Sequence, residues 1–347
     1  MHNPLLLQPL GWQPFFQQQI NLEELDQAEI ARVVAHNRSD YLLSNGDETF
    51  SLPITPAVAE MTVGDWLLLE PGRQFGRLLE RKSLFKRKAA GSKIDEQLIA
   101  ANVDTLLIVC SLNDDFNLNR IERYLALAHE AQVTPVVVLT KADLCPDSDA
   151  KQQAVQSLDP LLMVVAVNAT DADSCAPLLA WCGVGQTLSL LGSSGVGKST
   201  LANTLLGQAL QQTAAIREDD SKGRHTTTAR SLLCLPSGAV LIDTPGMREL
   251  QLAACEEGVR QVFADIETWA EGCKFSDCHH TGEPGCAVAN AVAAGELSPR
   301  RLHNYQKLLA EQARNSASLQ ELRAKEKRFG RLVKSVGSES RKNKKGY

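Results

Sequence analysis

The sequence has no long hydrophobic run. Its longest uninterrupted apolar stretch, residues 161–167, is far shorter than the ~20 residues that a helix needs to cross a bilayer. The first ten residues, MHNPLLLQPL, contain no lysine or arginine and are interrupted by prolines, so they do not resemble a signal peptide. We therefore expect a cytoplasmic protein without membrane contacts, in which the nine cysteines are reduced.

An excess of positive charge is also missing. The chain has 36 Lys and Arg against 41 Asp and Glu, which excludes a uniformly basic nucleic-acid-binding protein. The charge is uneven, however: residues 300–347 contain 14 basic and 4 acidic residues, and residues 72–93 contain eight basic and one acidic. Each run is either a contact for a polyanion or simply a solvated surface.

No internal repeat is apparent, and the 347 residues suffice for two or three domains. Residues 1–30 read as an extension, to which we assign no function. Residues 31–95 alternate apolar and polar residues between turn signals, which predicts a small β-barrel. An oligonucleotide-binding barrel is one such fold, but alternation alone does not separate it from others.

The pattern of apolar and polar residues changes after the predicted barrel. Residues 96–252 contain fully apolar strands separated by helical stretches, which predicts an α/β domain with a parallel sheet covered on both faces. Residues 253–347 contain helices, a cluster of cysteine and histidine, and the basic tail. Ser298 and Pro299 have the residue types of a helix start.

A phosphate-binding loop lies between a predicted strand and a predicted helix. Its glycines let the backbone turn N–H groups toward phosphates, its lysine supplies a charge to the β and γ oxygens, and its serine hydroxyl can bind Mg²⁺. The candidate nucleotide-binding residues are Gly192, Ser193, Ser194, Gly195, Val196, Gly197, Lys198, Ser199 and Thr200.

Two further elements fit a nucleoside triphosphate site. A predicted strand ends at Asp243, whose carboxylate can hold Mg²⁺, and the N–H of Gly246 can contact the γ-phosphate. The polar stretch Gly223-Arg-His-Thr-Thr-Thr228 offers a threonine to the Mg²⁺ shell. Thr227 is our candidate, although the sequence does not distinguish it from its two neighbours.

A base-recognition element follows another apolar strand, at Thr140, Lys141, Ala142 and Asp143. The Asp143 carboxylate can accept from the two adjacent donors of guanine, a pair that adenine lacks, so this element favours GTP. GTPases usually have Asn where Thr140 stands, and the hydroxyl makes one hydrogen bond fewer, a loss of roughly 0.5–1.5 kcal/mol. A later strand end, Asn168-Ala169, can place the Ala169 N–H near the guanine carbonyl.

The order of these motifs is reversed relative to most GTPases, because the base element precedes the phosphate loop. This order indicates a circular permutation, in which the original termini are joined and the chain begins at another position of the same fold. Such a permutation is possible because the termini of a domain often lie close together at its surface.

A cysteine and histidine cluster lies between residues 273 and 286. Three thiolates and one imidazole suit a tetrahedral Zn²⁺, and four protein ligands indicate a structural site. The cluster contains Cys273, Cys278, Cys286 and two adjacent histidines, between which the spacing does not choose. The other six cysteines are scattered and fit buried packing positions.

The motif order, GSSGVGKST, GRHTTT, DTPG and the cluster together resemble the ribosome small-subunit-dependent GTPase A family over nearly the whole chain. The resemblance implies an oligonucleotide-binding barrel, a permuted GTPase and a helical zinc domain, and it selects His280 as the fourth zinc ligand. It also implies GTP hydrolysis stimulated by the small ribosomal subunit, a role in late maturation of that subunit, and contact with its RNA. We expect a monomer.

The reaction expected is in-line attack of water on the γ-phosphate, with Lys198 and Mg²⁺ on Ser199 and Asp243 stabilising the transferred group. Met247 stands where the usual water-orienting Gln is found, and a thioether cannot orient water. His225 is our candidate replacement, although it fits an RNA contact or a solvated position equally well. Two alternatives are a nucleotide-ordered RNA-binding scaffold with negligible turnover and a small-molecule kinase.

Overall fold

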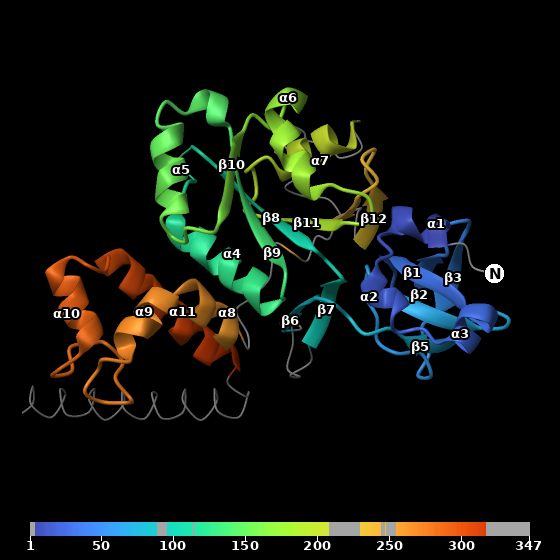
Figure 1. Cartoon of the computed structure of the whole chain (residues 1–347), viewed down its shortest axis with the longest axis horizontal. Coiled ribbons are helices and arrows are strands. Elements are labelled where there is room, and N and C mark those ends of the chain that lie inside the picture. The colour runs from blue at the N-terminus through green and yellow to red at the C-terminus, as the bar shows by residue number, and fades with distance from the viewer. Residues whose placement is uncertain are drawn as a thin grey trace, which may run out of the picture.

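The computed structural model describes residues 4–88, 96–113, 115–207, 230–243, 247 and 255–316. Figure 1 shows three regions in a row: N-terminal strands, a central α/β region and C-terminal helices. Among the helices of the described ranges, none combines the length and the apolar character that crossing a bilayer requires.

Five antiparallel strands form the N-terminal region, in the order β3-β2-β1-β4-β5. Alternating side chains such as Val33, Leu43 and Leu69 fill its core. This pairing is that of a partly open oligonucleotide-binding barrel, as expected. The strands are β1 (Glu29–His36), β2 (Asp40–Ser44), β3 (Thr49–Pro53), β4 (Trp66–Glu70) and β5 (Gln74–Leu78).

The N-terminal extension packs on the barrel. Trp12 and Phe16 lie against Trp66, with ring centroids 4.7 and 5.8 Å from it. Gln13 reaches the central region, where its Nε2 donates to Asp104 and to the Gly185 carbonyl, both at 2.8 Å. The extension contains α1 (Pro4–Leu7), η1 (Gln8–Leu10), α2 (Pro14–Gln17) and α3 (Leu22–Gln27).

The central sheet has the order β10-β9-β8-β11-β13-β12, with β12 alone antiparallel to its neighbour. Both faces are buried: Leu106 and Ile108 of β8 enter one core, and Leu107 and Val109 enter the other. This two-sided burial explains the unbroken apolar strands. The strands are β8 (Thr105–Ser111), β9 (Thr134–Thr140), β10 (Met163–Val167), β11 (Thr187–Leu191), β12 (Arg230–Cys234) and β13 (Val240–Asp243).

The order of the strands in this sheet changes direction between β8 and β11. The chain passes from β8 to β9 and β10 on one side, then returns to β11 and β13 on the other. Ligands of such sheets bind where the direction reverses, at the carboxyl ends of the strands. The connecting helices are α4 (Leu118–Glu130), η2 (Ala142–Leu144), α5 (Ser148–Gln156), α6 (Ala172–Cys175), η3 (Ala176–Trp181) and α7 (Lys198–Leu206).

The barrel and the central sheet are joined, which the sequence pattern did not indicate. β1 pairs with β12, so that hydrogen bonds run from one sheet into the other. In addition, β6 (Leu84–Lys88) pairs with β7 (Glu96–Ala101) across the expected boundary between the two domains.

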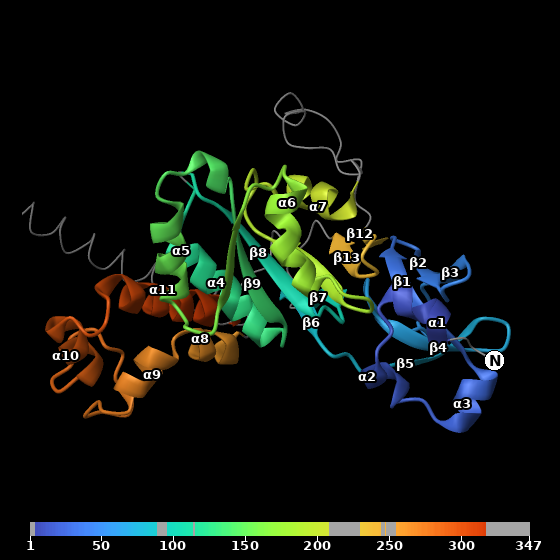
Figure 2. The same cartoon turned by 45° about the horizontal axis from the view of Figure 1, so that its top comes forward.

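Four helices form the described C-terminal region, which lies on the other side of the central sheet from the barrel (Figure 2). α8 packs closely on α4, since a Cβ atom at Gly258 would lie 2.0 Å from the Ala126 carbonyl oxygen. α11 begins at Pro299, as expected. The helices are α8 (Glu256–Val262), α9 (Ala264–Ala270), α10 (Ala287–Ala294) and α11 (Pro299–Ser316).

Candidate nucleotide site and metal site

The phosphate loop connects β11 to α7 at the carboxyl edge of the sheet. Two of its glycines are required by geometry: a Cβ atom on Gly192 would lie 2.2 Å from the Val109 carbonyl oxygen, and Gly197 has φ of +97°. The loop leads into the N-terminus of α7, where the N–H groups of the first turn favour an anion.

Lys198 is the first residue of α7 and is buried. Its ammonium lies inside the loop, donating to the Gly192 carbonyl at 2.7 Å and to the Ser193 carbonyl. Ser194 and Gly195 are exposed, while Ser199 and Thr200 are half-buried at the start of the helix.

The base element touches the phosphate loop directly. The Thr140 hydroxyl, fully buried at the end of β9, donates to the Val196 carbonyl at 2.6 Å. The Lys141 ammonium donates to the Gly195 carbonyl at 3.3 Å. β8 alone separates β9 from β11, so the two segments meet although the contacting residues are 54 and 56 positions apart in sequence.

The remaining base residues line the same edge of the sheet. Ala142 and Asp143 lie on η2, with the Asp143 side chain exposed. Asn168 and Ala169 follow β10, and the Ala169 carbonyl accepts from the Thr204 hydroxyl of α7 at 2.6 Å. This bond ties the loop after β10 to the helix that begins at the phosphate loop.

Asp243 is exposed at the end of β13, the strand beside β11. His225, Thr227 and Gly246 lie outside the described residues. Met247 is 1% exposed and packs in the same core as Leu106 and Ile108 of β8.

The four expected metal ligands converge. Cys273, Cys278, His280 and Cys286 place their sulfur and nitrogen atoms within 4.8 Å of one another. The Cys273 and Cys286 sulfurs are 3.9 Å apart, and His280 Nδ1 lies 3.7 and 3.4 Å from them. Bonds of about 2.3 Å to sulfur and about 2.0 Å to nitrogen in a tetrahedron give edges near these values, so the donor set fits Zn²⁺.

The chain around the cluster holds it in shape. His280 has φ of +58°, which directs its ring inward, while the neighbouring His279 is exposed. The Glu283 carboxylate accepts from the backbone N–H groups of His279 and Thr281 at 2.9 and 2.7 Å. Gln306 of α11 donates to the carbonyls of His279 and His280. The loop is thus also hydrogen-bonded to α11.

Comparison with known proteins identifies the family. The RsgA GTPase model matches residues 78–253. A relative from Vibrio parahaemolyticus, small ribosomal subunit biogenesis GTPase RsgA 2, is 59% identical over 99% of this chain and 96% of its own length. A relative from Mesorhizobium japonicum, small ribosomal subunit biogenesis GTPase RsgA, is 47% identical over 89% of this chain and 91% of its own.

The chain belongs to the RsgA GTPase family. It is therefore a GTP-hydrolysing enzyme, and membership implies a guanine nucleotide with Mg²⁺ as its ligand. The scaffold and kinase alternatives are not favoured. An ABC transporter model also matches residues 181–329, a range that includes the phosphate loop that many nucleotide-binding proteins share.

Solved structures show the same RsgA-type fold. YjeQ from Thermotoga maritima aligns with a TM-score of 0.60 at 23% identity, covering 82% of this chain and 98% of that one. YloQ, described as a circularly permuted GTPase, aligns with a TM-score of 0.57 at 22% identity, covering 84% and 96%. The expected circular permutation is confirmed.

One residue of this RsgA GTPase site was missed from the sequence. Arg120, in the first turn of α4, donates from Nη1 to the Ser193 hydroxyl at 2.6 Å and to the Asp115 carboxylate at 2.6 Å. No motif identified Arg120, because its contact with the phosphate loop depends on how α4 packs.

Proposed function

We propose that this RsgA GTPase binds the small ribosomal subunit, hydrolyses GTP when that subunit stimulates it, and acts in late maturation of the subunit. The contact of Thr140 and Lys141 with the phosphate loop supports the nucleotide part of this proposal, because it brings the base-recognition element and the phosphate loop together. The ribosomal part is supported by the relatives, which are small ribosomal subunit biogenesis GTPases.

The base residues have the role of selecting guanine. Asp143 accepts from the two donor groups on the guanine edge, the Lys141 stem lies along the base, and Ala169 faces the carbonyl of guanine from the loop with Asn168. Exposure of the Asp143 carboxylate at the edge of the sheet supports this assignment. Ala142 supplies backbone between the two charged residues.

The phosphate loop residues hold the triphosphate through backbone N–H groups, and Lys198 stabilises charge on the transferred phosphoryl group. The residues that would hold Mg²⁺ are Ser199 and Asp243, with Thr227 as a third. When bound, the ion neutralises the developing charge on the phosphates. Gly246 contacts the γ-phosphate and His225 orients the attacking water.

The Cys273, Cys278, His280 and Cys286 cluster holds one structural Zn²⁺. The convergence of four soft donors within 4.8 Å supports it. The ion's role is to stabilise the fold of the C-terminal region, which presents α11 and the basic tail to ribosomal RNA. We place the protein in the cytoplasm, as a monomer, with the barrel as a second RNA contact.

Release of phosphate from GTP is the test, with ATP as the control nucleotide, in the presence of purified small subunits, large subunits or neither. We expect hydrolysis of GTP but not of ATP. Small subunits, but not large subunits, should accelerate this hydrolysis. Asp143→Asn is expected to weaken GTP binding and reduce discrimination against other purine nucleotides. Asp147→Asn is the matched control, since Asp147 is exposed on the same loop and its side chain caps no helix.

Equal acceleration by both subunits, or by neither, would contradict the proposal. Negligible GTP turnover under all three conditions with intact GTP binding would instead favour the scaffold.

A further inference from the structure

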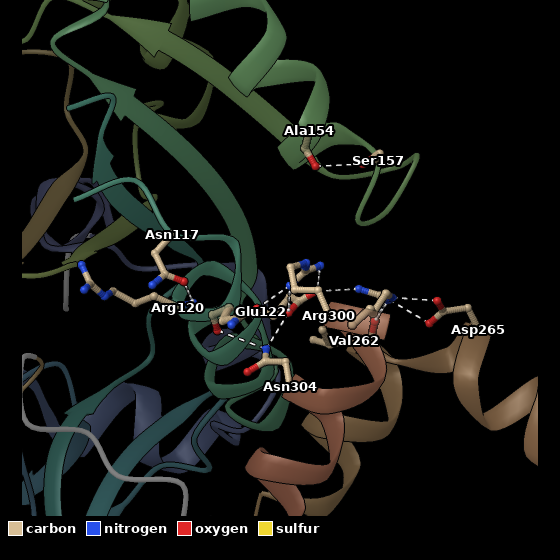
Figure 3. Close-up of polar contacts among 11 residues, drawn as sticks. Asn117, Arg120, Glu122, Ala154, Ser157, Val262, Asp265, Arg300 and Asn304 are labelled. Atoms are coloured by element: carbon tan, nitrogen blue, oxygen red, sulfur yellow. Dashed lines mark hydrogen bonds and ion pairs between the residues drawn. The ribbon is translucent and has the colours of Figure 1, made fainter. Parts of the chain in front are cut away.

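A buried polar cluster that the nucleotide site does not use lies between α4 and α11 (Figure 3). Its centre is the Glu122 carboxylate, which is fully buried. It accepts from two nitrogens of Arg300 at 2.9 Å, from Arg301 at 2.9 Å and from Asn304 at 2.5 Å. One carboxylate of the GTPase region thus binds three side chains of the C-terminal region.

The charges of this cluster are balanced across the two regions. Arg301 also makes a two-bond contact with Asp265 of α9, at 2.7 and 2.8 Å, and donates to the Val262 carbonyl of α8 at 2.6 Å. Removal of one partner from a buried, charged and hydrogen-bonded group is costly. The cluster therefore makes α8, α9 and α11 move with α4 as one body.

The same turn of α4 also reaches the phosphate loop. Asn119 accepts from Arg300 at 2.5 Å, and the next residue, Arg120, donates to the Ser193 hydroxyl at 2.6 Å. Figure 3 shows Arg120 extending away from the side of α4 where Arg300 and Asn304 lie. Residues 119–122 thus touch the C-terminal region on one side and the nucleotide site on the other.

Ser193 links this contact to the lysine of the site. Its hydroxyl accepts from Arg120, and its carbonyl accepts from the Lys198 ammonium. Ser193 thus contacts both Arg120 and Lys198, and its carbonyl is one of the two that bind the lysine. Lys307 and Arg314 of α11 are exposed and basic. A polyanion that binds them can displace this helix.

We propose that Arg120 is a positioning residue of the phosphate loop, and that the turn 119–122 transmits to it a displacement of the C-terminal region. The proposal rests on the proposed function for the source of the displacement, which is binding of the small subunit. Arg120 does not touch the reacting atoms and acts through Ser193 and Lys198. Misplacement of a group at the reacting centre by about 1 Å can lower the rate about 100-fold. A small shift of Ser193 and Lys198 is therefore sufficient to change turnover.

The first test is a double-mutant cycle between Arg120→Gln and Ser193→Ala, read as kcat and KM for GTP without ribosomes. We expect each single variant to lower kcat at least about threefold with a smaller change in KM, and the double variant to be no worse than the worse single one. Arg120→Lys, which keeps a donor, is expected to recover part of the loss. Multiplying effects, or wild-type kcat in Arg120→Gln, would overturn the positioning role.

Arg123→Gln is the matched control. Arg123 is on the next turn of α4 and pairs with Glu311 of α11 at 2.7 Å, so it tests loss of an α4–α11 charge without loss of the loop contact. A fall in basal kcat as large as that of Arg120→Gln would overturn the assignment, because general loosening of α4 would then explain both.

The second test concerns transmission. In the presence of small subunits, Arg120→Gln and Arg300→Gln are each expected to reduce the stimulation of kcat about tenfold, and together no further. Independent, multiplying losses would overturn transmission through this turn. The two proposals fail separately: a wild-type protein that small subunits do not stimulate refutes the proposed function, whereas the first cycle is read without ribosomes.

Discussion

At the scale of single residues, Thr140 stands at the position where GTPases usually have asparagine. Its hydroxyl is buried and donates to the Val196 carbonyl, so the residue contacts the phosphate loop. A buried carbonyl without a donor is destabilising, which makes this bond important to the shape of the phosphate loop.

Thr140→Val removes the donor while keeping the shape of the side chain. We expect GTP and GDP to bind about fivefold more weakly, corresponding to about 1 kcal/mol, and equally so because the contact is remote from the γ-phosphate. Titration with fluorescent nucleotide measures both affinities. Thr134→Val, at the exposed start of the same strand, is the control, and unchanged affinities for Thr140→Val would refute the role of the bond.

At the scale of elements, short segments are stabilised by specific polar contacts. α3 begins with a reciprocal capping box between Asn21 and Glu24, and the Glu24 carboxylate also binds Arg77 of β5 at 2.7 and 3.0 Å. The Arg77 hydrogen bond, followed by that from the Asn21 backbone, lowers the pKa of Glu24 to about 2. This six-residue helix is thus attached to the barrel by charge.

Acid is expected to weaken this attachment. Because the folded pKa of Glu24 lies below the unfolded value, its contribution to stability is complete above about pH 4.5 and is lost as the pH falls through about 2. Glu24→Gln should therefore melt at a lower temperature than wild type at pH 7, and the difference should shrink toward pH 2. Glu23→Gln, exposed on the same helix, should show no such convergence.

Removal of metal is the second prediction at this scale. α9 and α10 are joined through the four-ligand cluster, so a chelator should lower the melting temperature and the helical circular dichroism. Elemental analysis should find zinc in the wild type and in Cys234→Ser, whose thiol lies outside the cluster, but little in Cys278→Ser. Unchanged melting after complete loss of metal would show that the ion does not stabilise this region.

At the scale of the whole molecule, buried contacts fix the extension, the barrel and the GTPase together. Arg32 is fully buried in β1, and it donates to carbonyls of Leu10 and Gly64 and to the Thr187 hydroxyl. Burial lowers the pKa of Arg32 to about 10, opposed by the charges of Asp104 and Asp65, and the group remains charged at neutral pH. Together with the Glu122 cluster, this contact joins the barrel, the GTPase region and the C-terminal region through buried polar side chains.

Binding to small subunits is expected to weaken with salt. Neutralised RNA phosphates release counterions, so the affinity should fall at least about tenfold between about 50 and about 200 mM salt. Co-sedimentation at several salt concentrations measures this slope. A chain that ends at residue 316 lacks most of the basic tail and should give a shallower slope. Affinity independent of salt would contradict RNA phosphate contacts.

Local sequence determined the barrel strands, the parallel sheet, the phosphate loop and the three cysteines of the metal cluster, because each depends on short-range periodicity or spacing. The choice of His280 over His279 came from the family resemblance. Only tertiary structure decided that Thr140 binds Val196, that β1 joins the central sheet through β12, and that Arg120 and Glu122 connect the nucleotide site to α11. These contacts join residues far apart in the chain, and neither periodicity nor motif spacing encodes which distant partners packing brings together.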